Sequence, residues 1–371
     1  MRKRTLIPLL IAVILLCALG AMFYLRANAP PEAARLLPES DAIAYLNLKS
    51  IRSATHFDQT SIQRSPDFQQ FIDATGIVPE RDLDAVALAL HRMPNPNGPN
   101  GPVAYSEVFI GRFDGVRLDH YLASIASAQE IYTGRTIYTI PIETGGPRTR
   151  PLRIAQLGYD VIAASNMPTP EQIHSMLDRF RSGALSTPGS SLLAARYHEV
   201  PLLSEAWGIG HIGLPFSDNG LISVLGLQLP LPEDTDFVAS LRYTAAAHVL
   251  SGGAVHLRIE EIAPDPASAH STVEALTTLL NILRGIGSEQ AAAQQATTHQ
   301  AENPSSTAIR TILNATTLTD HDSRAVLNAT ASLDQLKALT TAHNPAASPL
   351  ETPATSVPTP PATQTPRAAS K

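Results

Sequence analysis

Residues 5–25 form an apolar run without a single charged side chain, and no other feature constrains the fold of the N-terminus as strongly. About 20 consecutive apolar residues match the thickness of a bilayer's hydrocarbon core. Arg2, Lys3 and Arg4 precede the run, and basic residues next to a span normally stay in the cytoplasm. The sequence therefore predicts a cytoplasmic tip and a transmembrane signal anchor over residues 1–25, with the bulk of the chain extracytoplasmic.

Two other interpretations of this run stay open. Residues 27–29 (Ala-Asn-Ala) have the form that signal peptidase cleaves, but Pro30 follows directly and the run is longer than the 7–15 residues of the apolar region of a usual signal peptide. Cys17 could carry a lipid, but it lies inside the run and follows two leucines where a small residue is required. A retained anchor is the interpretation that these features favour.

The composition excludes several classes of function. The chain has 371 residues and a net charge of −6, and no basic cluster follows the N-terminal one, so we expect no nucleic-acid partner. Cys17 is the only cysteine. The rest of the chain therefore has no disulfide, no catalytic thiol and no cysteine-based zinc site.

The sequence divides into segments by composition and pattern. We expect a stalk over residues 26–35, a first α+β unit over 36–183, a linker over 184–198 and a second α+β unit over 199–343. Residues 344–371 are rich in Pro, Thr, Ala and Ser and cannot bury enough apolar surface to fold, which predicts a disordered tail.

The two units show a similar order of elements. Each opens with a buried strand, at residues 41–48 and 206–212, and each ends in a hairpin, a capping box and a helix. The capping boxes, Thr169–Gln172 and Ser332–Gln335, begin 163 residues apart. The last hairpin is predicted to join residues 308–317 to 323–330. The alternative is two unrelated runs of common elements.

Strands that follow one another through short turns favour antiparallel pairing. The predicted fold class is α+β: an N-terminal transmembrane helix, then two similar units of mixed or antiparallel sheet with helices, and a disordered tail.

One set of side chains could bind a metal ion. His248 and His256 flank Ser251–Gly253, so a tight turn there would place them opposite each other, with Glu260 on the same face. The alternatives are a solvated sheet face and a looser loop without pairing. No other cofactor is expected, because the chain lacks the glycine-rich nucleotide motifs and has neither GxSxG nor HExxH.

Residues 35–48 (RLLPESDAIAYLNL) and 71–86 (FIDATGIVPERDLDAV) carry a resemblance to known proteins. The first segment resembles the start of the exported part of uncharacterised, signal-anchored bacterial envelope proteins, and some of these contain a segment like the second. The resemblance implies a domain of unknown function at the bacterial inner membrane, and it supplies no catalytic residues.

Two functional hypotheses follow. The first is a non-enzymatic binding or scaffolding module of the cell envelope, with an envelope protein or a cell-wall component as partner. The second is an extracytoplasmic hydrolase or metal-dependent enzyme, in which His248, His256 and Glu260 converge on one pocket.

Overall fold

The structure is a computed structural model of the full chain. It describes residues 29–59, 64–95, 101–143, 149–183, 189–212, 221–224, 227–230, 235–244, 253–297 and 304–342.

The first unit contains seven strands. In chain order its elements are α2 (Glu32–Leu36), β1 (Ala42–Leu46), α3 (Leu48–Thr55), η1 (Phe57–Gln59), α4 (Pro66–Thr75), α5 (Pro79–Asp82), β2 (Leu83–Arg92), β3 (Val103–Gly111), α6 (Gly115–Ile125), β4 (Ala128–Tyr132), β5 (Arg135–Glu143), β6 (Thr149–Gln156), β7 (Val161–Ser165) and α7 (Glu171–Ser182).

The second unit follows a short helical connection. Its elements are α8 (Ser191–Arg196), η2 (Tyr197–Glu199), β8 (Ala206–Ile212), β9 (Leu221–Val224), β10 (Leu227–Pro230), β11 (Thr235–Thr244), β12 (Ala254–Ile262), α9 (Pro266–Thr297), α10 (Pro304–Ala315), β13 (Thr317–His321), β14 (Arg324–Ser332) and α11 (Leu333–Ala342).

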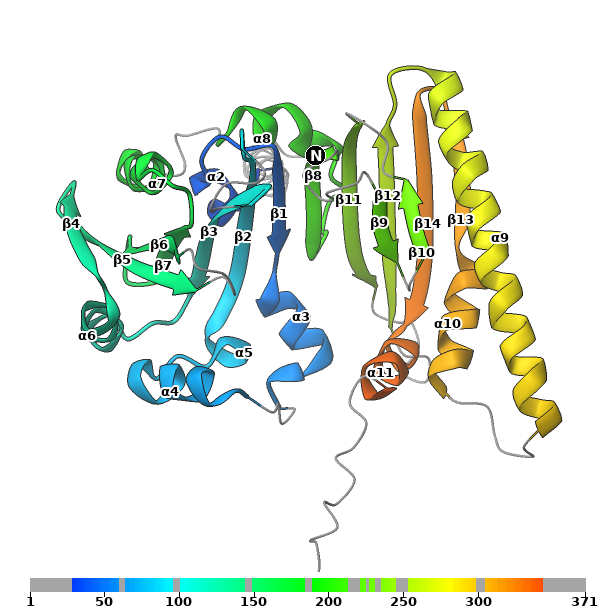
Figure 1. Ribbon diagram of the computed structural model, residues 1–371, viewed down its shortest axis with the longest axis horizontal. Helices are drawn as coiled ribbons and strands as arrows, with labels where there is room; N and C mark the ends of the chain where they lie inside the picture. Colours follow the sequence, from blue (N-terminus) through cyan, green and yellow to red (C-terminus); the bar gives the residue numbers. More distant parts are fainter. Residues whose placement is uncertain are drawn as a thin grey trace, which may run out of the picture.

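Twelve strands form one continuous sheet that crosses both units. Its order is β13-β14-β12-β11-β8-β1-β2-β3-β7-β6-β5-β4, and β9 pairs separately with β10. All neighbouring pairs are antiparallel. In Figure 1 the sheet extends from β4 at one side of the molecule to β13, behind α9, at the other.

The two units have the same strand order outward from the centre. The first has β1-β2-β3-β7-β6 and the second has β8-β11-β12-β14-β13, while β5 and β4 extend the first unit alone. The units meet where β1 pairs with β8, and Tyr45 lies directly opposite Trp207 with their rings stacked at 5.5 Å. The two predicted opening strands therefore join the units into one sheet.

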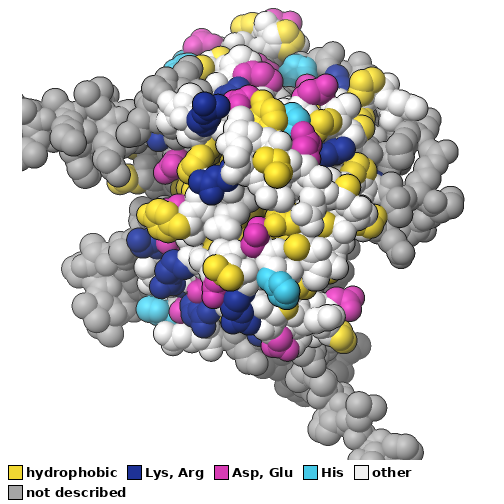
Figure 2. All heavy atoms as spheres, turned by 90° about the vertical axis from the view of Figure 1, so that its left-hand side faces the viewer, with side chains coloured by type: hydrophobic (Ala, Val, Ile, Leu, Met, Phe, Trp, Pro, Cys, Tyr) yellow, Lys and Arg dark blue, Asp and Glu magenta, His cyan; other side chains and the backbone are white. Residues whose placement is uncertain are grey.

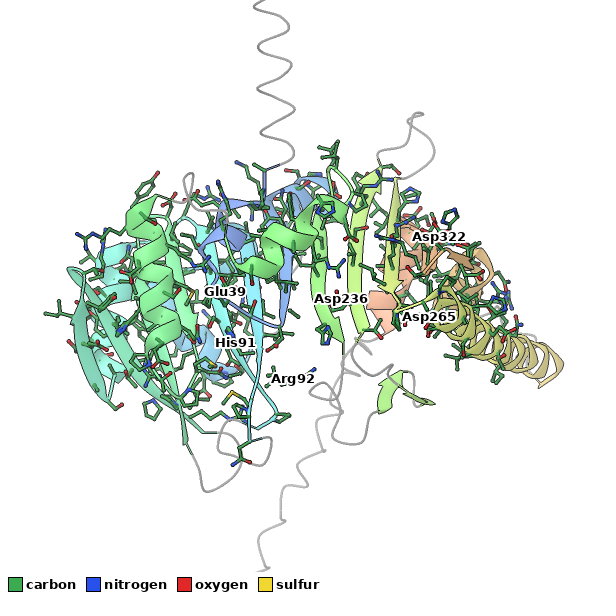
Figure 3. All side chains as sticks on the ribbon, turned by 90° about the horizontal axis from the view of Figure 1, so that it is seen from above. Glu39, His91, Arg92, Asp236, Asp265 and Asp322 are labelled. Carbon is green, nitrogen blue, oxygen red and sulfur yellow. The ribbon has the colours of Figure 1, made fainter. Side chains whose placement is uncertain are left out.

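Helices cover the two faces of the sheet differently. Paired residues share a face, so Ile43, Ala87 and Ile209 point to one side, where α2, α7 and α8 pack in a common core. We call this side the α7 face; Figure 3 shows α7 and α8 together on it. On the opposite α9 face, α6 contacts Tyr138 of β5, and Thr272 of α9 donates a hydrogen bond to Glu261 of β12.

The predicted start signals are confirmed for α4 and α11, but the capping box predicted for α7 does not form. The Ser65 side chain caps α4, with Pro66 at its first position and Gly76 in the left-handed conformation at its end. Ser332 and Gln335 exchange two hydrogen bonds, which is a complete capping box for α11. Thr169 forms no such box, because α7 starts at Glu171 after Pro170 and the Thr169 hydroxyl bonds the Glu171 carboxylate instead.

The predicted fold class needs correction. The predicted transmembrane helix, residues 5–25, lies outside the described residues, and within the described residues no helix is both long and apolar enough to cross a membrane. The longest, α9, has 32 residues but is interrupted by polar and charged side chains such as Glu274 and Arg284. The described fold is an antiparallel twelve-stranded sheet with helices, and both units contribute strands to it.

Three segment predictions also differ from the structure. The predicted stalk, residues 26–35, ends in α2, where Ala33, Ala34 and Leu36 are completely buried. The predicted linker, residues 184–198, contains α8, whose Leu193 is completely buried. Most of residues 308–317 belong to α10, so the hairpin is β13–β14 alone. The tail, residues 344–371, lies outside the described residues.

Candidate functional site

The structure describes two of the three predicted metal ligands, His256 and Glu260. His248 lies outside the described residues, in the connection between β11 and β12. His256 lies opposite Arg242 of β11, because the strands pair from Thr244 and Ala254 inward rather than around a tight turn. Among the residues that the structure describes, no three His, Cys, Asp or Glu side chains gather as a metal site would require.

The side chains of His256 and Glu260 already have partners. The Nε2 atom of His256 is 2.9 Å from the hydroxyl of Thr244, and its Nδ1 atom is 3.1 Å from that of Thr330. Glu260 is 7% exposed and accepts hydrogen bonds from Arg258, at 2.7 Å, and from Arg324. Burial alone would raise the pKa of Glu260, but these two arginines hold it below its ordinary value. Glu260 is therefore a fixed negative charge.

The same face of β12 does form part of a groove. Strand pairing places Arg242, His256 and Thr330 in one row across β11, β12 and β14. The next row toward the centre of these strands is Ser240, Arg258 and Asn328. Neighbouring strands lie about 4.8 Å apart and rows about 6.8 Å apart, so these six side chains form a compact polar grid on the α7 face.

This polar groove has a volume of about 370 Å³. Its floor is the grid, and the segment from Glu199 to Pro201 bounds one side. The volume lies within the range of small-molecule sites, about 300–1,000 Å³. The lining is predominantly polar, which distinguishes it from a gap in the apolar core.

A chain of charged side chains and one histidine includes Glu199 and Glu260, which line the polar groove. It runs from His211 through Asp236, Arg196, Glu199 and Arg324 to Glu260, where Arg258 completes it. The separations are 2.8 Å for His211–Asp236 and 3.0 Å for both contacts of Glu199, while Arg196–Asp236 and Arg324–Glu260 are shorter still. Figure 3 labels Asp236 on the second-unit side of the β1–β8 junction and His91 on the first-unit side. The chain ties η2 to β11, β12 and β14 and fixes the groove's shape.

The equivalent surface of the first unit is covered. There α7 packs Ile173, Met176 and Leu177 onto Val108 and other small apolar residues of β3, β6 and β7. In the second unit α11 follows the equivalent hairpin but packs against α10 instead. The uncovered sheet positions are polar, as solvent exposure requires.

A serine–histidine pair in the first unit is the arrangement closest to a catalytic one. The Nε2 atom of His91 is 2.9 Å from the Ser106 hydroxyl, which is 3.0 Å from the Ser165 hydroxyl. Ser106 is completely buried and His91 is 5% exposed, so a substrate has no access to this serine. The three side chains satisfy one another beneath the helices of the α7 face.

A larger hollow of about 580 Å³ lies on the α9 face between α6 and the β4–β5 hairpin. It is lined by Asp119, His120 and Arg135 among others, but the Asp119 carboxylate already accepts a hydrogen bond from the Tyr138 hydroxyl at 2.7 Å. Figure 2 looks onto the β4 edge of the molecule, where hydrophobic and charged side chains are interspersed. This hollow lacks the ordered rows of donors found in the polar groove.

Comparison with known proteins identifies no family. No protein-family model matches the chain, and no curated protein matches it. A solved structure of TP0453, crystal form III, is similar at a TM-score of 0.41 and 12% identity, over 84% of this chain and 99% of that one. Crystal form I of TP0453 gives 0.38 and 12%, over 85% and 98%. A similarity at this level supports no conclusion about function.

Proposed function

We propose that this protein is a non-enzymatic binding module and that the polar groove is its ligand site. The observation that carries the proposal is the open grid of polar side chains on β11, β12 and β14. The strands that carry the grid belong to a continuous sheet, which holds a binding surface in a fixed geometry.

The groove offers binding groups but no catalytic set. Its histidine, His256, contacts two threonine hydroxyls and no carboxylate that could orient it as a general base. Its carboxylates, Glu199 and Glu260, are both held by arginines. Both oxygens of each carboxylate already accept hydrogen bonds from arginines, so neither side chain has an oxygen free to orient a water molecule or a substrate hydroxyl.

The alternative is a hydrolase that uses Ser106 and His91. It requires that the helices of the α7 face open to admit a substrate, because Ser106 is completely buried. The 2.9 Å contact between His91 and Ser106 is the specific observation in its favour. An extracytoplasmic location and an envelope partner, expected from the sequence, stay predictions for either function.

Affinity selection with mass spectrometry separates the two functions. The full chain is incubated with a panel of carboxylates, phosphate monoesters, sugars, amino acids and ester substrates, and both retained compounds and new products are measured. A binding module retains a compound, releases it unchanged and loses it on Arg242→Gln, whereas Arg135→Gln, an exposed arginine on β5, has no effect. Product formation that Ser106→Ala abolishes would overturn the proposal.

A further inference from the structure

We infer that the polar groove binds an oxyanion, a carboxylate or phosphate group on a small molecule, between Arg242, Arg258 and the side chains around them. This inference rests on the proposed function and adds the chemical class of the ligand. The argument starts from the balance of hydrogen-bond donors and acceptors in the groove.

Several hydrogen-bond donors that line the groove have no partner within the described residues. Arg242 is exposed and has no ion pair or hydrogen bond within the described part of the chain. Arg258 uses its Nε and Nη2 atoms on Glu260, which leaves its Nη1 group without a partner among the described residues. Guanidinium groups match the geometry of carboxylate and phosphate oxygens and bind them with two parallel hydrogen bonds.

Ser240 supplies an independent observation. Its side chain lies between the two arginines on the groove floor and the residue is only 5% exposed, yet it has no hydrogen-bond partner within the described residues. A hydroxyl without a partner in the protein is available for a hydrogen bond with a ligand. Since it lines the groove, an oxygen of a ligand at this position would satisfy it.

The acidic side chains at the groove do not compete for the arginines that remain free. Glu199 accepts from Arg196 and Arg324, and Glu260 accepts from Arg258 and Arg324. On the opposite side Glu205 accepts a hydrogen bond from the Tyr243 backbone amide at 2.8 Å. Arg242 therefore makes no ion pair with a described carboxylate, and its exposed guanidinium can bind an anionic group of a ligand.

Two side chains of β14 on the other side of the groove can also donate hydrogen bonds. Asn328 makes no side-chain hydrogen bond with the described residues, and the Thr330 hydroxyl can bond a ligand as well as His256. The volume of about 370 Å³ admits a small molecule and not a folded partner.

The test is isothermal titration calorimetry of the full chain with inorganic phosphate, glycerol phosphate, succinate and neutral glycerol, each at the same ionic strength. We expect at least one of the three anions to bind, and the order among them distinguishes a phosphate from a carboxylate ligand. Arg242→Gln should weaken that affinity at least about tenfold, since a hydrogen bond to a charged group contributes about 1.5–3 kcal/mol.

Two further variants keep the result interpretable. Thr330→Val removes one hydroxyl at nearly constant shape and should weaken binding less than Arg242→Gln. Arg135→Gln removes an exposed arginine of the first unit and should leave the affinity unchanged.

Unchanged anion affinity in Arg242→Gln would overturn the inference, as would the absence of anion binding. Binding of a neutral compound in the groove would overturn the inference that the ligand is an anion but would agree with the proposed binding function. Conversion of a compound to product would contradict both the inference and the proposed function.

Discussion

Replacing Trp207 with alanine removes the side chain that packs the two units together at the centre of the sheet. Trp207 is 4% exposed, stacks on Tyr45 at 5.5 Å and meets Tyr197 edge-on at 5.3 Å. Buried tryptophan-to-alanine changes cost about 3–5 kcal/mol, which includes the cavity that remains. The two aromatic contacts place this site in the upper half of that range.

Urea unfolding followed by far-UV circular dichroism measures this cost, because the variant has no tryptophan fluorescence. The matched control is Tyr159→Ala, an aromatic residue that is 83% exposed, and its free energy of unfolding should stay within about 0.5 kcal/mol of the parent. A cost below about 1 kcal/mol for Trp207→Ala would refute the packing at the β1–β8 junction.

The parent protein gives a second result in the same experiment. Trp207 is its only tryptophan, so its fluorescence reports the junction alone. If the sheet is one cooperative structure, the fluorescence and circular dichroism transitions coincide. A fluorescence transition at clearly lower urea would show that the two units separate before they unfold.

Three other predictions concern the fold. Leu36→Ala in α2 should lower the free energy of unfolding, measured by heat or urea, by about 2–5 kcal/mol because Leu36 is completely buried. Val116→Ala, at an 81% exposed site, should leave it almost unchanged. Equal effects of the two changes would contradict the packing of α2. Burial lowers the pKa of His91 below 6.5, so its contribution to stability is present above pH 6.5 and is lost as the pH falls; the parent's stability should therefore drop more than that of His91→Gln between pH 7.5 and 5.5, and parallel curves would contradict this. Gly210→Ala should destabilise the protein by more than about 1 kcal/mol, because the φ of Gly210 is 155° and the new Cβ would lie 2.4 Å from an atom of β1. Gly285→Ala, in open space on α9, should instead stabilise the protein by about 0.5–1 kcal/mol. Calorimetry of both variants measures these opposite changes in stability.

Local sequence signals predicted the elements better than their assembly. Ser65, Pro66 and Gly76 specify the ends of α4 by their own backbone and side-chain chemistry, and the structure has all three in those roles. The hairpin predicted over residues 308–317 and 323–330 is wrong in its first part, because Ile309, Ile312 and Leu313 have helical spacing and lie in α10. Short apolar segments fit both the helical and the strand period, so their contacts with the rest of the fold decide which of the two forms.

For the candidate site too, the sequence predicted local features but not how distant strands come together. The sequence predicts His256 and Glu260 on one face of a strand, and both lie on the same face of β12. The groove also needs Arg242 from β11 and Asn328 from β14, and strand register across 70 residues cannot be obtained from one sequence. The sequence also gave no sign that α11 would leave this face uncovered, because that depends on its packing against α10.

Hydrogen–deuterium exchange of the full chain, with and without a saturating amount of whichever of inorganic phosphate, glycerol phosphate and succinate binds, tests the groove as the binding site most directly. The account predicts slower exchange in residues 240–244, 254–260 and 326–332, the strand segments that carry the grid, and no change in the first unit. Protection centred on another part of the chain, or no protection while the compound is bound, would contradict it.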